Sequence, residues 1–176
     1  MKLLLHTCCA PCSIYPVQVL RQMSIDVMGF FYRYNIHPFQ ECLKREDTLK
    51  EYTDSIGLKM IYQHDYKIEE FIQSIVFRET DRCRVCYHDR LLQTAIFAKK
   101  GNFEAFSTTL LYSRFQNHEG IRETGEAIAT KYGIQFFYHD FREGWKFGIE
   151  ESKRLNLYRQ QYCGCIYSEK DRYYKK

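Results

Sequence analysis

Seven of the eight cysteines fall into three tight groups, so thiol chemistry is the first function to consider. Core packing does not gather a small apolar residue in this way, and the grouping therefore favours metal ligation or redox thiols. Cys42 stands alone on an expected helix, and we interpret it as a packing residue. The grouped residues are Cys8, Cys9 and Cys12, then Cys83 and Cys86, and finally Cys163 and Cys165.

Three chemistries suit these spacings. The two C-x₂-C pairs could hold zinc, although the 71 residues between Cys12 and Cys83 (83 − 12) far exceed the spacing in compact zinc ribbons. The segment Cys9-Ala-Pro-Cys12 also suits a thioredoxin-like dithiol, which would leave the later groups without a role. An iron–sulfur cluster needs about four thiolates and takes them from such pairs and from distant cysteines. Seven grouped cysteines exceed that need, which indicates a second metal or redox thiols beside the cluster.

Five short apolar segments alternate with helical patterns along the chain. This order predicts a doubly wound α/β fold with a mostly parallel sheet covered on both faces. The length of 176 residues suits one domain, and we expect a single α/β domain over residues 1–176. The expected strands are 2–6, 26–32, 58–63, 103–107 and 134–139, and the expected helices are 16–23, 38–56, 68–76, 84–100 and 120–132.

Ligands of open α/β sheets bind at the carboxyl ends of the strands, near the point where the strand order reverses. The first expected strand leads directly into Cys8, the third into Asp65 and the fifth into Asp140. Either aspartate could act as an oxygen ligand or as an acid. Helix capping is the plainer role for both, because aspartate at such a position caps a helix well.

The net charge of +4 lies entirely in the last part of the chain. Residues 1–141 hold 17 Lys and Arg against 17 Asp and Glu, whereas residues 142–176 hold 9 against 5. Mixed with tyrosines, this basic tail suits nucleic acid, although charge alone fits a solvated helix face equally well. We expect the tail to pack over the site.

No apolar run approaches the roughly 20 residues of a membrane span, so no membrane partner is expected. The apolar segment after Lys2 is too short for a signal peptide, which predicts a cytoplasmic protein.

Four motifs give the chain a specific resemblance. They are His6-Thr-Cys-Cys-Ala-Pro-Cys12, Cys83-Arg-Val-Cys-Tyr87, Asp140-Phe-Arg-Glu-Gly-Trp145 and Tyr158-Arg-Gln-Gln-Tyr-Cys-Gly-Cys165. Together they resemble the QueH family of epoxyqueuosine reductases over residues 3–168. The resemblance implies a sheet like that of the adenine-nucleotide alpha-hydrolase (HUP-like) group. It also implies reduction of epoxyqueuosine at the tRNA wobble position to queuosine, with a [4Fe–4S] cluster and a further iron nearby.

Removal of the epoxide oxygen takes two electrons, which a cluster passes one at a time, and an adjacent iron can hold the leaving oxygen. The electron donor is not identified by the sequence. We expect Cys8, Cys9, Cys83 and Cys86 to hold the cluster, with Cys12 as the alternative to Cys8 or Cys9, because adjacent cysteines rarely suit one cluster equally. We expect Cys163 and Cys165 to hold the second iron, completed by Cys12 or by a carboxylate from Asp65 or Asp140.

The substrate base must leave the anticodon stack to reach such a site. Phosphates of the tRNA are expected to meet Arg33, Arg45, Lys153, Arg154 and Arg159. Two other functions remain open on the residues alone. One is a zinc-stabilised module that binds nucleic acid without catalysis, and the other is a dithiol oxidoreductase that needs no metal.

Overall fold

The sheet has five parallel strands in the order β3-β2-β1-β4-β5. A computed structural model describes residues 1–174; Lys175 and Lys176 of the basic tail lie outside the described residues. The order runs outward from β1 in both directions, so the reversal point lies between β1 and β4. The strands are β1 (Lys2–His6), β2 (Asp26–Tyr32), β3 (Met60–Gln63), β4 (Ala105–Thr108) and β5 (Gln135–Phe136).

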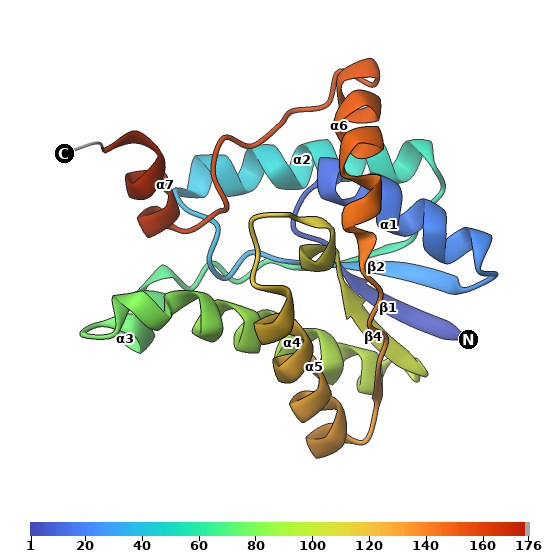
Figure 1. The fold of residues 1–176 in the computed structure, drawn as a ribbon, viewed down its shortest axis with the longest axis horizontal. Helices are drawn as coiled ribbons and strands as arrows, with labels where there is room; N and C mark the ends of the chain where they lie inside the picture. Colours follow the sequence, from blue (N-terminus) through green and yellow to red (C-terminus); the bar gives the residue numbers. More distant parts are fainter. Residues whose placement is uncertain (175–176) are drawn as a thin grey trace.

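Helices cover both faces of the sheet, which confirms the doubly wound α/β class (Figure 1). One layer holds α1 (Ala10–Gln22) and α2 (Phe39–Ser55), and the other holds α4 (Arg82–Lys100) and α5 (His118–Tyr132). Within residues 1–174, no helix is both long and apolar enough to span a membrane. The remaining elements are α3 (Ile68–Ile75), α6 (Trp145–Arg154), α7 (Ile166–Tyr173) and the 3₁₀ turns η1 (Glu79–Asp81), η2 (Thr109–Tyr112) and η3 (Phe141–Gly144).

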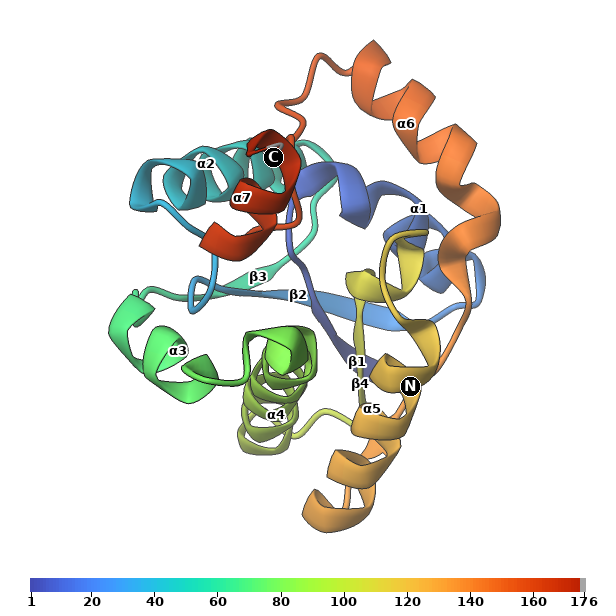
Figure 2. The same ribbon diagram turned by 60° about the vertical axis from the view of Figure 1, so that its left-hand side comes forward.

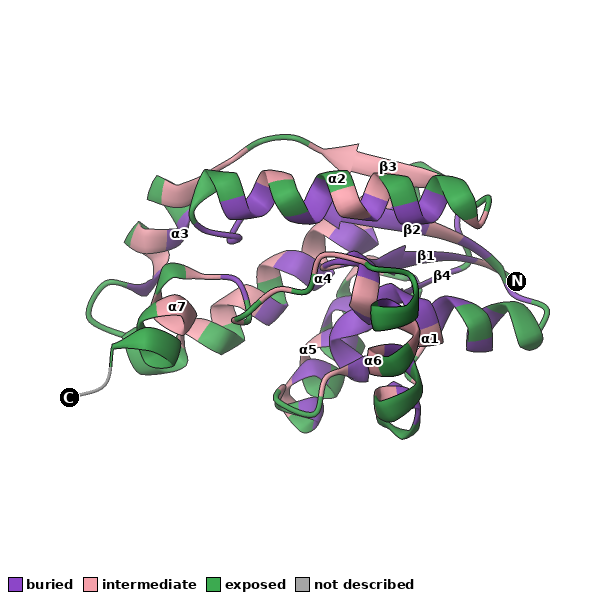
Figure 3. Ribbon diagram, turned by 90° about the horizontal axis from the view of Figure 1, so that it is seen from above, coloured by how far each residue is buried: buried purple, intermediate pink, exposed green. Residues whose placement is uncertain are grey.

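The core lies around the central strand. Leu3, Leu4 and Leu5 of β1 are consecutive and fully buried, as a strand covered on both faces requires. Figure 3 shows β1 and β2 coloured largely as buried, whereas α7 is partly to fully exposed. The placement of residues 1–176 in one domain stays a prediction.

Several expected boundaries differ from those of the structure, and three of these differences concern the site. The first helix begins at Ala10 rather than at residue 16, so Cys12 lies inside it; Pro11 fits its first turn and Pro16 is accommodated within it. Helix α4 begins at Arg82 rather than at residue 84, which brings Cys83 into its first turn. Strand β5 pairs over only Gln135 and Phe136, because an edge strand needs only a few ladder contacts with its single neighbour.

The end of the chain returns across α1 through η3 and α6 (Figure 2). Gly144 marks the closest approach, because a Cβ added there would lie 2.1 Å from the Tyr15 ring. The Tyr15 hydroxyl donates a hydrogen bond to Glu143 Oε1 at 2.7 Å, on the exposed side of the same contact. Burial and the neighbouring Glu143 carboxylate together raise the pKa of Tyr15 to about 12.

We predict that Gly144→Ala destabilises the protein by about 1–3 kcal/mol, because the new methyl group overlaps the Tyr15 ring. Glu143→Ala is the matched control: it removes one exposed hydrogen bond and should change the free energy of unfolding by less than about 1 kcal/mol. Urea unfolding of both variants measures the difference. Equal stability of the two variants would contradict the close packing of η3 on α1.

Candidate metal centre

Three thiols meet in the turn between β1 and α1. Cys8 lies in the turn, Cys9 is the N-cap residue of α1, and Cys12 follows in the first turn of the helix. Their three Sγ atoms all lie within 4.8 Å of one another, with Cys8 and Cys9 at 3.8 Å. Cys9 and Cys12 are buried and Cys8 is partly buried, so the group is shielded from bulk water.

Polar side chains from distant segments contact this cysteine triad (Cys8, Cys9 and Cys12). Thr109, at the end of β4, donates its hydroxyl to Cys8 Sγ at 3.4 Å and accepts the Cys8 backbone N–H at 3.2 Å. Gln160, in the segment after α6, donates to Cys9 Sγ at 2.9 Å. The sequence motifs gave no role to Thr109 or to Gln160, although Gln160 stands three residues before Cys163 in one of them.

The triad favours one negative sulfur over three. Hydrogen bonds from Cys12 and then Cys9 hold the pKa of Cys8 well below its usual range, against the opposing effect of burial. Burial raises the pKa of Cys9. The hydrogen bonds to Cys8 and Cys9 raise the pKa of Cys12. Without further positive charge, the group therefore carries its first negative charge on Cys8.

The other four grouped cysteines come from α4 and from the segment before α7. Cys83 and Cys86 lie in the first turns of α4, and Cys165 is the N-cap residue of α7. Burial raises the pKa of Cys83, and the neighbouring thiols Cys86 and Cys165 add to that shift. Cys163 links this set to the triad, because it interacts with Cys8 as well as with Cys165.

A buried guanidinium lies beside these thiols. Arg90 of α4 is 4% exposed, and no carboxylate of residues 1–174 lies within ion-pair distance of it. Burial lowers the pKa of Arg90, but the neighbouring thiols, first Cys86 and then Cys8, outweigh it and raise that pKa. The guanidinium also donates to the Asn35 side-chain oxygen. Sequence reasoning missed Arg90, and no pattern distinguishes it from a surface arginine.

His6 connects Arg90 to the sheet and fixes its own tautomer. Burial, and then the charge of Arg90, lower the pKa of His6 to about 3, so the ring is neutral. Arg90 Nη1 lies 3.0 Å from His6 Nε2, and a guanidinium only donates, so Nε2 accepts. The proton therefore lies on Nδ1, which donates to Thr108 Oγ1 at 2.9 Å.

The Cys163-Gly-Cys165 loop is held against the start of α2 by Arg45. This side chain is 1% exposed, and its guanidinium pairs with Glu41 at 2.8 Å. It also donates to the carbonyl oxygens of Cys163 at 2.7 Å and Tyr162 at 3.0 Å. The expectation that Arg45 faces tRNA was wrong, because a buried cation fixes the loop and cannot reach a phosphate.

The Arg33 guanidinium also forms an ion pair inside the protein. Its side chain is 14% exposed, and its Nε pairs with the buried Glu46 carboxylate at 2.5 Å. Hydrogen bonding to Glu46 raises the pKa of Arg33 and outweighs burial. The structure therefore gives Arg33 an internal partner in place of the expected phosphate.

The two candidate aspartates lie at opposite edges of the sheet. Asp65 follows β3 and is exposed, where its carboxylate accepts from Gln63 at 3.2 Å. Asp140 follows β5 and pairs with Arg142, whose hydrogen bond lowers the pKa of Asp140 to about 2. Each strand is two positions from β1, about 10 Å away. Within residues 1–174, neither carboxylate belongs to the group formed by Cys8, Cys9 and Cys12. Asp140 caps the 3₁₀ turn η3, which is the simpler of the two roles considered for it.

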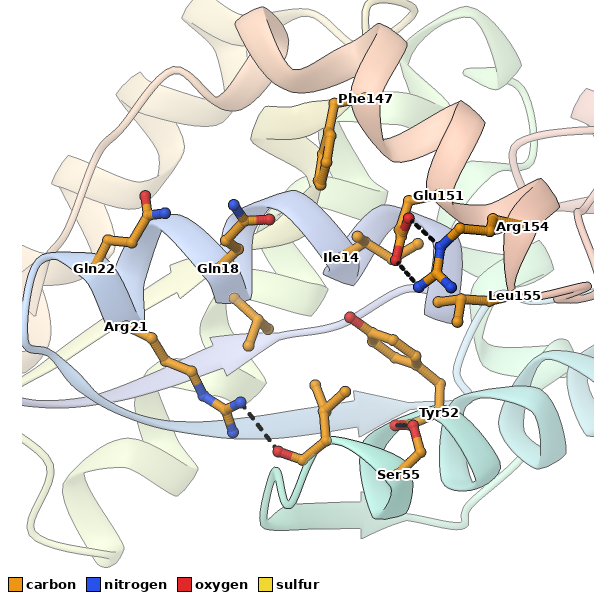
Figure 4. Close-up of a pocket in the computed structure, with 12 residues that line it drawn as sticks. Ile14, Gln18, Arg21, Gln22, Tyr52, Ser55, Phe147, Glu151, Arg154 and Leu155 are labelled. Atoms are coloured by element: carbon orange, nitrogen blue, oxygen red, sulfur yellow. Dashed lines mark hydrogen bonds and ion pairs between the residues drawn. The ribbon is translucent and has the colours of Figure 1, made fainter.

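A groove of about 650 Å³ runs between α1, α2 and α6, and no cysteine lines it (Figure 4). Arg154 extends into this groove and pairs with Glu151 at 2.6 Å. Arg21 points toward α2 and donates to the Ile56 carbonyl at 3.0 Å. Lys153 and Arg159 are exposed, and no ion pair joins either to another residue that the structure describes.

A doubly wound α/β sheet with a buried thiol group at its reversal point defines the class: a cysteine-rich α/β protein with a candidate metal centre at the carboxyl edge of the sheet. The chain belongs to the epoxyqueuosine reductase QueH family, whose model matches residues 3–171. This match confirms the family that the motifs resembled.

Relatives of nearly the same length support the assignment. The chain is 37% identical to epoxyqueuosine reductase QueH of Dehalococcoides mccartyi, over 99% of this chain and 96% of that protein. It is 35% identical to the QueH of Thermotoga maritima, over 94% and 88% respectively. The crystal structure of a predicted tRNA methyltransferase subunit from Methanocaldococcus jannaschii shares the fold alone. Its TM-score is 0.57 at 11% identity, covering 87% of this chain and 76% of that one.

We predict that Arg45→Met frees the Cys163-Gly-Cys165 loop and speeds trypsin cleavage after Arg159 several-fold. The substitution removes two donors to the loop and leaves the buried Glu41 unpaired, which costs about 3–5 kcal/mol.

The variant Arg45→Met/Glu41→Leu separates these two effects. It removes the unpaired carboxylate, so stability should recover, while cleavage stays fast because the loop carbonyls still lack their donor. Arg154→Ala, which breaks an exposed pair, should change neither measurement. Wild-type cleavage rates in both Arg45 variants would show that Arg45 does not hold the loop.

Proposed function

We propose that this protein reduces epoxyqueuosine in tRNA to queuosine, using metal held by its grouped cysteines. The observation that carries the proposal is the cysteine triad at the reversal point of the sheet, in a chain of the QueH family. The reaction converts the epoxide, two electrons and two protons into an alkene and water. A cluster of the kind that the sequence suggests would supply those electrons singly when bound, and an iron beside it would act as a Lewis acid toward the leaving oxygen.

The sulfur geometry of the triad suits one metal ion. Four sulfurs arranged tetrahedrally around a metal at about 2.3 Å lie about 3.8 Å apart. Cys8 and Cys9 are separated by 3.8 Å, and Cys12 lies within 4.8 Å of both. We therefore favour Cys8, Cys9 and Cys12 as ligands of the single iron, with a fourth position left for substrate.

The remaining set then supplies the four thiolates that a [4Fe–4S] cluster takes. Its members are Cys83, Cys86, Cys163 and Cys165, which interact electrostatically with one another. This division differs from the one based on sequence, which assigns Cys8, Cys9, Cys83 and Cys86 to the cluster. Both divisions are predictions that the experiment below separates.

The charges around the centre suit thiolate ligands. A metal held by several thiolates carries net negative charge, and a buried charge needs compensation. Arg90 supplies a fixed positive charge beside Cys86 and Cys8 without a carboxylate of its own. Gln160 and Thr109 add hydrogen-bond donors to the sulfurs of Cys9 and Cys8. These residues hold the ligands in place; the roles expected of Asp65 and Asp140 stay predictions.

Substrate docking is assigned to the exposed part of the basic tail. Lys153 and Arg159 are free to meet phosphates, whereas Arg154 would first have to leave Glu151. The protein's own electron donor is not assigned. A tRNA bound along this surface would lie against the segment that carries Gln160 and Cys163, next to the candidate centre.

The test is anaerobic reconstitution with iron and sulfide, followed by reduction of tRNA that carries epoxyqueuosine. We expect queuosine to form. We expect Cys9→Ser/Cys12→Ser to keep the cluster's Mössbauer signal while losing the single-iron signal and the activity. Cys83→Ser/Cys86→Ser should lose the cluster signal, and Cys42→Ser should behave as wild type because Cys42 lies in a separate core cluster.

Loss of the cluster signal in Cys9→Ser/Cys12→Ser would favour the division based on sequence. A wild-type protein that holds only zinc, or that leaves epoxyqueuosine unchanged with a full iron complement and a chemical reductant, would overturn the proposed reaction.

Salt dependence tests the docking surface. Each phosphate contact releases counterions, so Lys153→Ala/Arg159→Ala should flatten the slope of log affinity against log salt by about 1–2 units. Lys59→Ala/Lys131→Ala removes two charges that precede β3 and β5, at the opposite edge of the sheet, and should leave the slope unchanged. The measurement is the tRNA affinity of both double variants between about 50 and 200 mM salt, the range in which phosphate contacts weaken. Equal slopes for the two variants would place the tRNA elsewhere.

A further inference from the structure

Phe115 is a large apolar side chain left in solvent. It lies in the loop between η2 and α5 and is 84% exposed. A ring this exposed contributes little hydrophobic free energy to folding. Its ring meets the Trp145 ring edge to face, with centroids 5.6 Å apart. Trp145 in turn packs on Tyr112 at 5.2 Å. Phe115 is thus supported by aromatic contacts that continue through Trp145 to the buried Tyr112, and most of its ring is open.

The loop that carries Phe115 is joined directly to the candidate metal centre. The next residue, Gln116, donates its side-chain N–H to Cys163 Sγ at 3.2 Å. The same side chain accepts from the Tyr87 hydroxyl at 2.9 Å, and that hydroxyl accepts the Asn117 backbone N–H at 3.2 Å. These bonds hold the loop on the side that faces the thiols, so the position of Phe115 is fixed relative to Cys163.

Two exposed arginines lie around the same aromatic stack. Burial raises the pKa of Tyr112; charges on Cys12 and Cys9 add to this, and Arg159 and Arg114 oppose it. Tyr112 is therefore near enough to the cysteine triad and to both guanidinium groups to feel their charge. Both arginines are exposed, and no ion pair joins either to another residue within 1–174. The open ring of Phe115 thus stands in the chain between an exposed arginine, Arg114, and Gln116, whose side chain contacts Cys163.

We infer that Phe115 is a stacking platform for an unpaired nucleobase next to the nucleotide being reduced. The inference rests on tRNA being the substrate. A base extracted from the anticodon leaves its neighbours unstacked, and an aromatic face replaces the lost stacking whatever the base is. Arg114 and Arg159 meet the phosphates of the same nucleotides, as charge complementarity requires. Gln116 sets the distance between this platform and the thiols.

A nucleobase fits these observations better than a protein partner does. A protein interface joins a central apolar patch to a polar rim, whereas here a single exposed ring follows an exposed arginine, Arg114, in the chain. Phe77 provides the comparison, since it is 96% exposed in the segment between α3 and η1, a different loop of the structure (Figures 1 and 2). None of the contacts that tie the Phe115 loop to Cys163 and Trp145 involves Phe77.

The probe is an anticodon stem-loop with 2-aminopurine on either side of the wobble nucleotide. Stacking on Phe115 should quench its fluorescence, and Phe115→Ala should abolish the quenching at one of the two positions. We expect Phe115→Ala to weaken stem-loop binding about tenfold or more, and Phe115→Tyr to restore it. Phe77→Ala should bind as wild type, and all three variants should keep the wild-type iron content.

In turnover, Phe115→Ala should raise KM for tRNA by a similar factor, because the ring binds the substrate rather than the metal. If wild type binds and reduces the tRNA but Phe115→Ala matches Phe77→Ala in affinity and quenching, this inference fails while the proposed function stands. If wild type neither binds nor reduces tRNA, the proposed function itself fails. Tight binding with quenching lost equally in both alanine variants would also overturn the assignment to Phe115.

Discussion

The buried charge of Arg90 is the constraint on which the candidate centre depends. Removing a guanidinium from water costs several kcal/mol unless it is compensated, and no carboxylate of the described chain does so. Its hydrogen bonds to neutral partners, His6 and Asn35, satisfy donors but cancel no charge. Cys86 and Cys8 both raise the pKa of Arg90. Burial raises the pKa of Cys86, whereas hydrogen bonds hold the pKa of Cys8 well below its usual range, so Cys8 supplies the negative charge. The fold is therefore arranged for a thiolate site, and holding thiolates there stabilises the cation as much as the cation stabilises them.

The topology explains why these groups meet. In a sheet of order β3-β2-β1-β4-β5, the chain leaves β1 on one face and β4 on the other, which opens a space at their carboxyl ends. His6 of β1 and Thr108 of β4 are paired in the sheet register at this junction, and the hydrogen bond between their side chains joins the two strand ends. Arg90 reaches the same point from α4. The late segment then covers the opening, because Arg45 and the start of α2 hold its backbone carbonyls.

The sequence predicts the alternation of strands and helices well, because continuous burial of β1 and the periodic faces of the helices are local signals. It also identifies the cysteines, since their grouping has no packing explanation. The contacts that a charged or polar side chain makes with distant residues are much harder to predict from the sequence. Arg45 and Arg33 look like surface cations, and only the fold shows that Glu41 and Glu46 neutralise them in the interior. Arg90, Gln160 and Gln116 act through segments 84, 151 and 47 residues away, distances over which no sequence period applies.

The helix start that the sequence misplaced has the largest consequence. With α1 beginning at Ala10, Cys9 and Cys12 are one turn apart at the N-terminus of a helix. Cys83 and Cys86 repeat this arrangement in the first turns of α4, which lies on the opposite face of the sheet. The spacing of three residues places both sulfurs of each pair on one side of their helix. A helix N-terminus favours negative charge, so two helices direct positive potential at the two thiol pairs from opposite layers. Burial raises the pKa of Cys86, and Arg90 opposes that shift in the same direction as the start of the helix does.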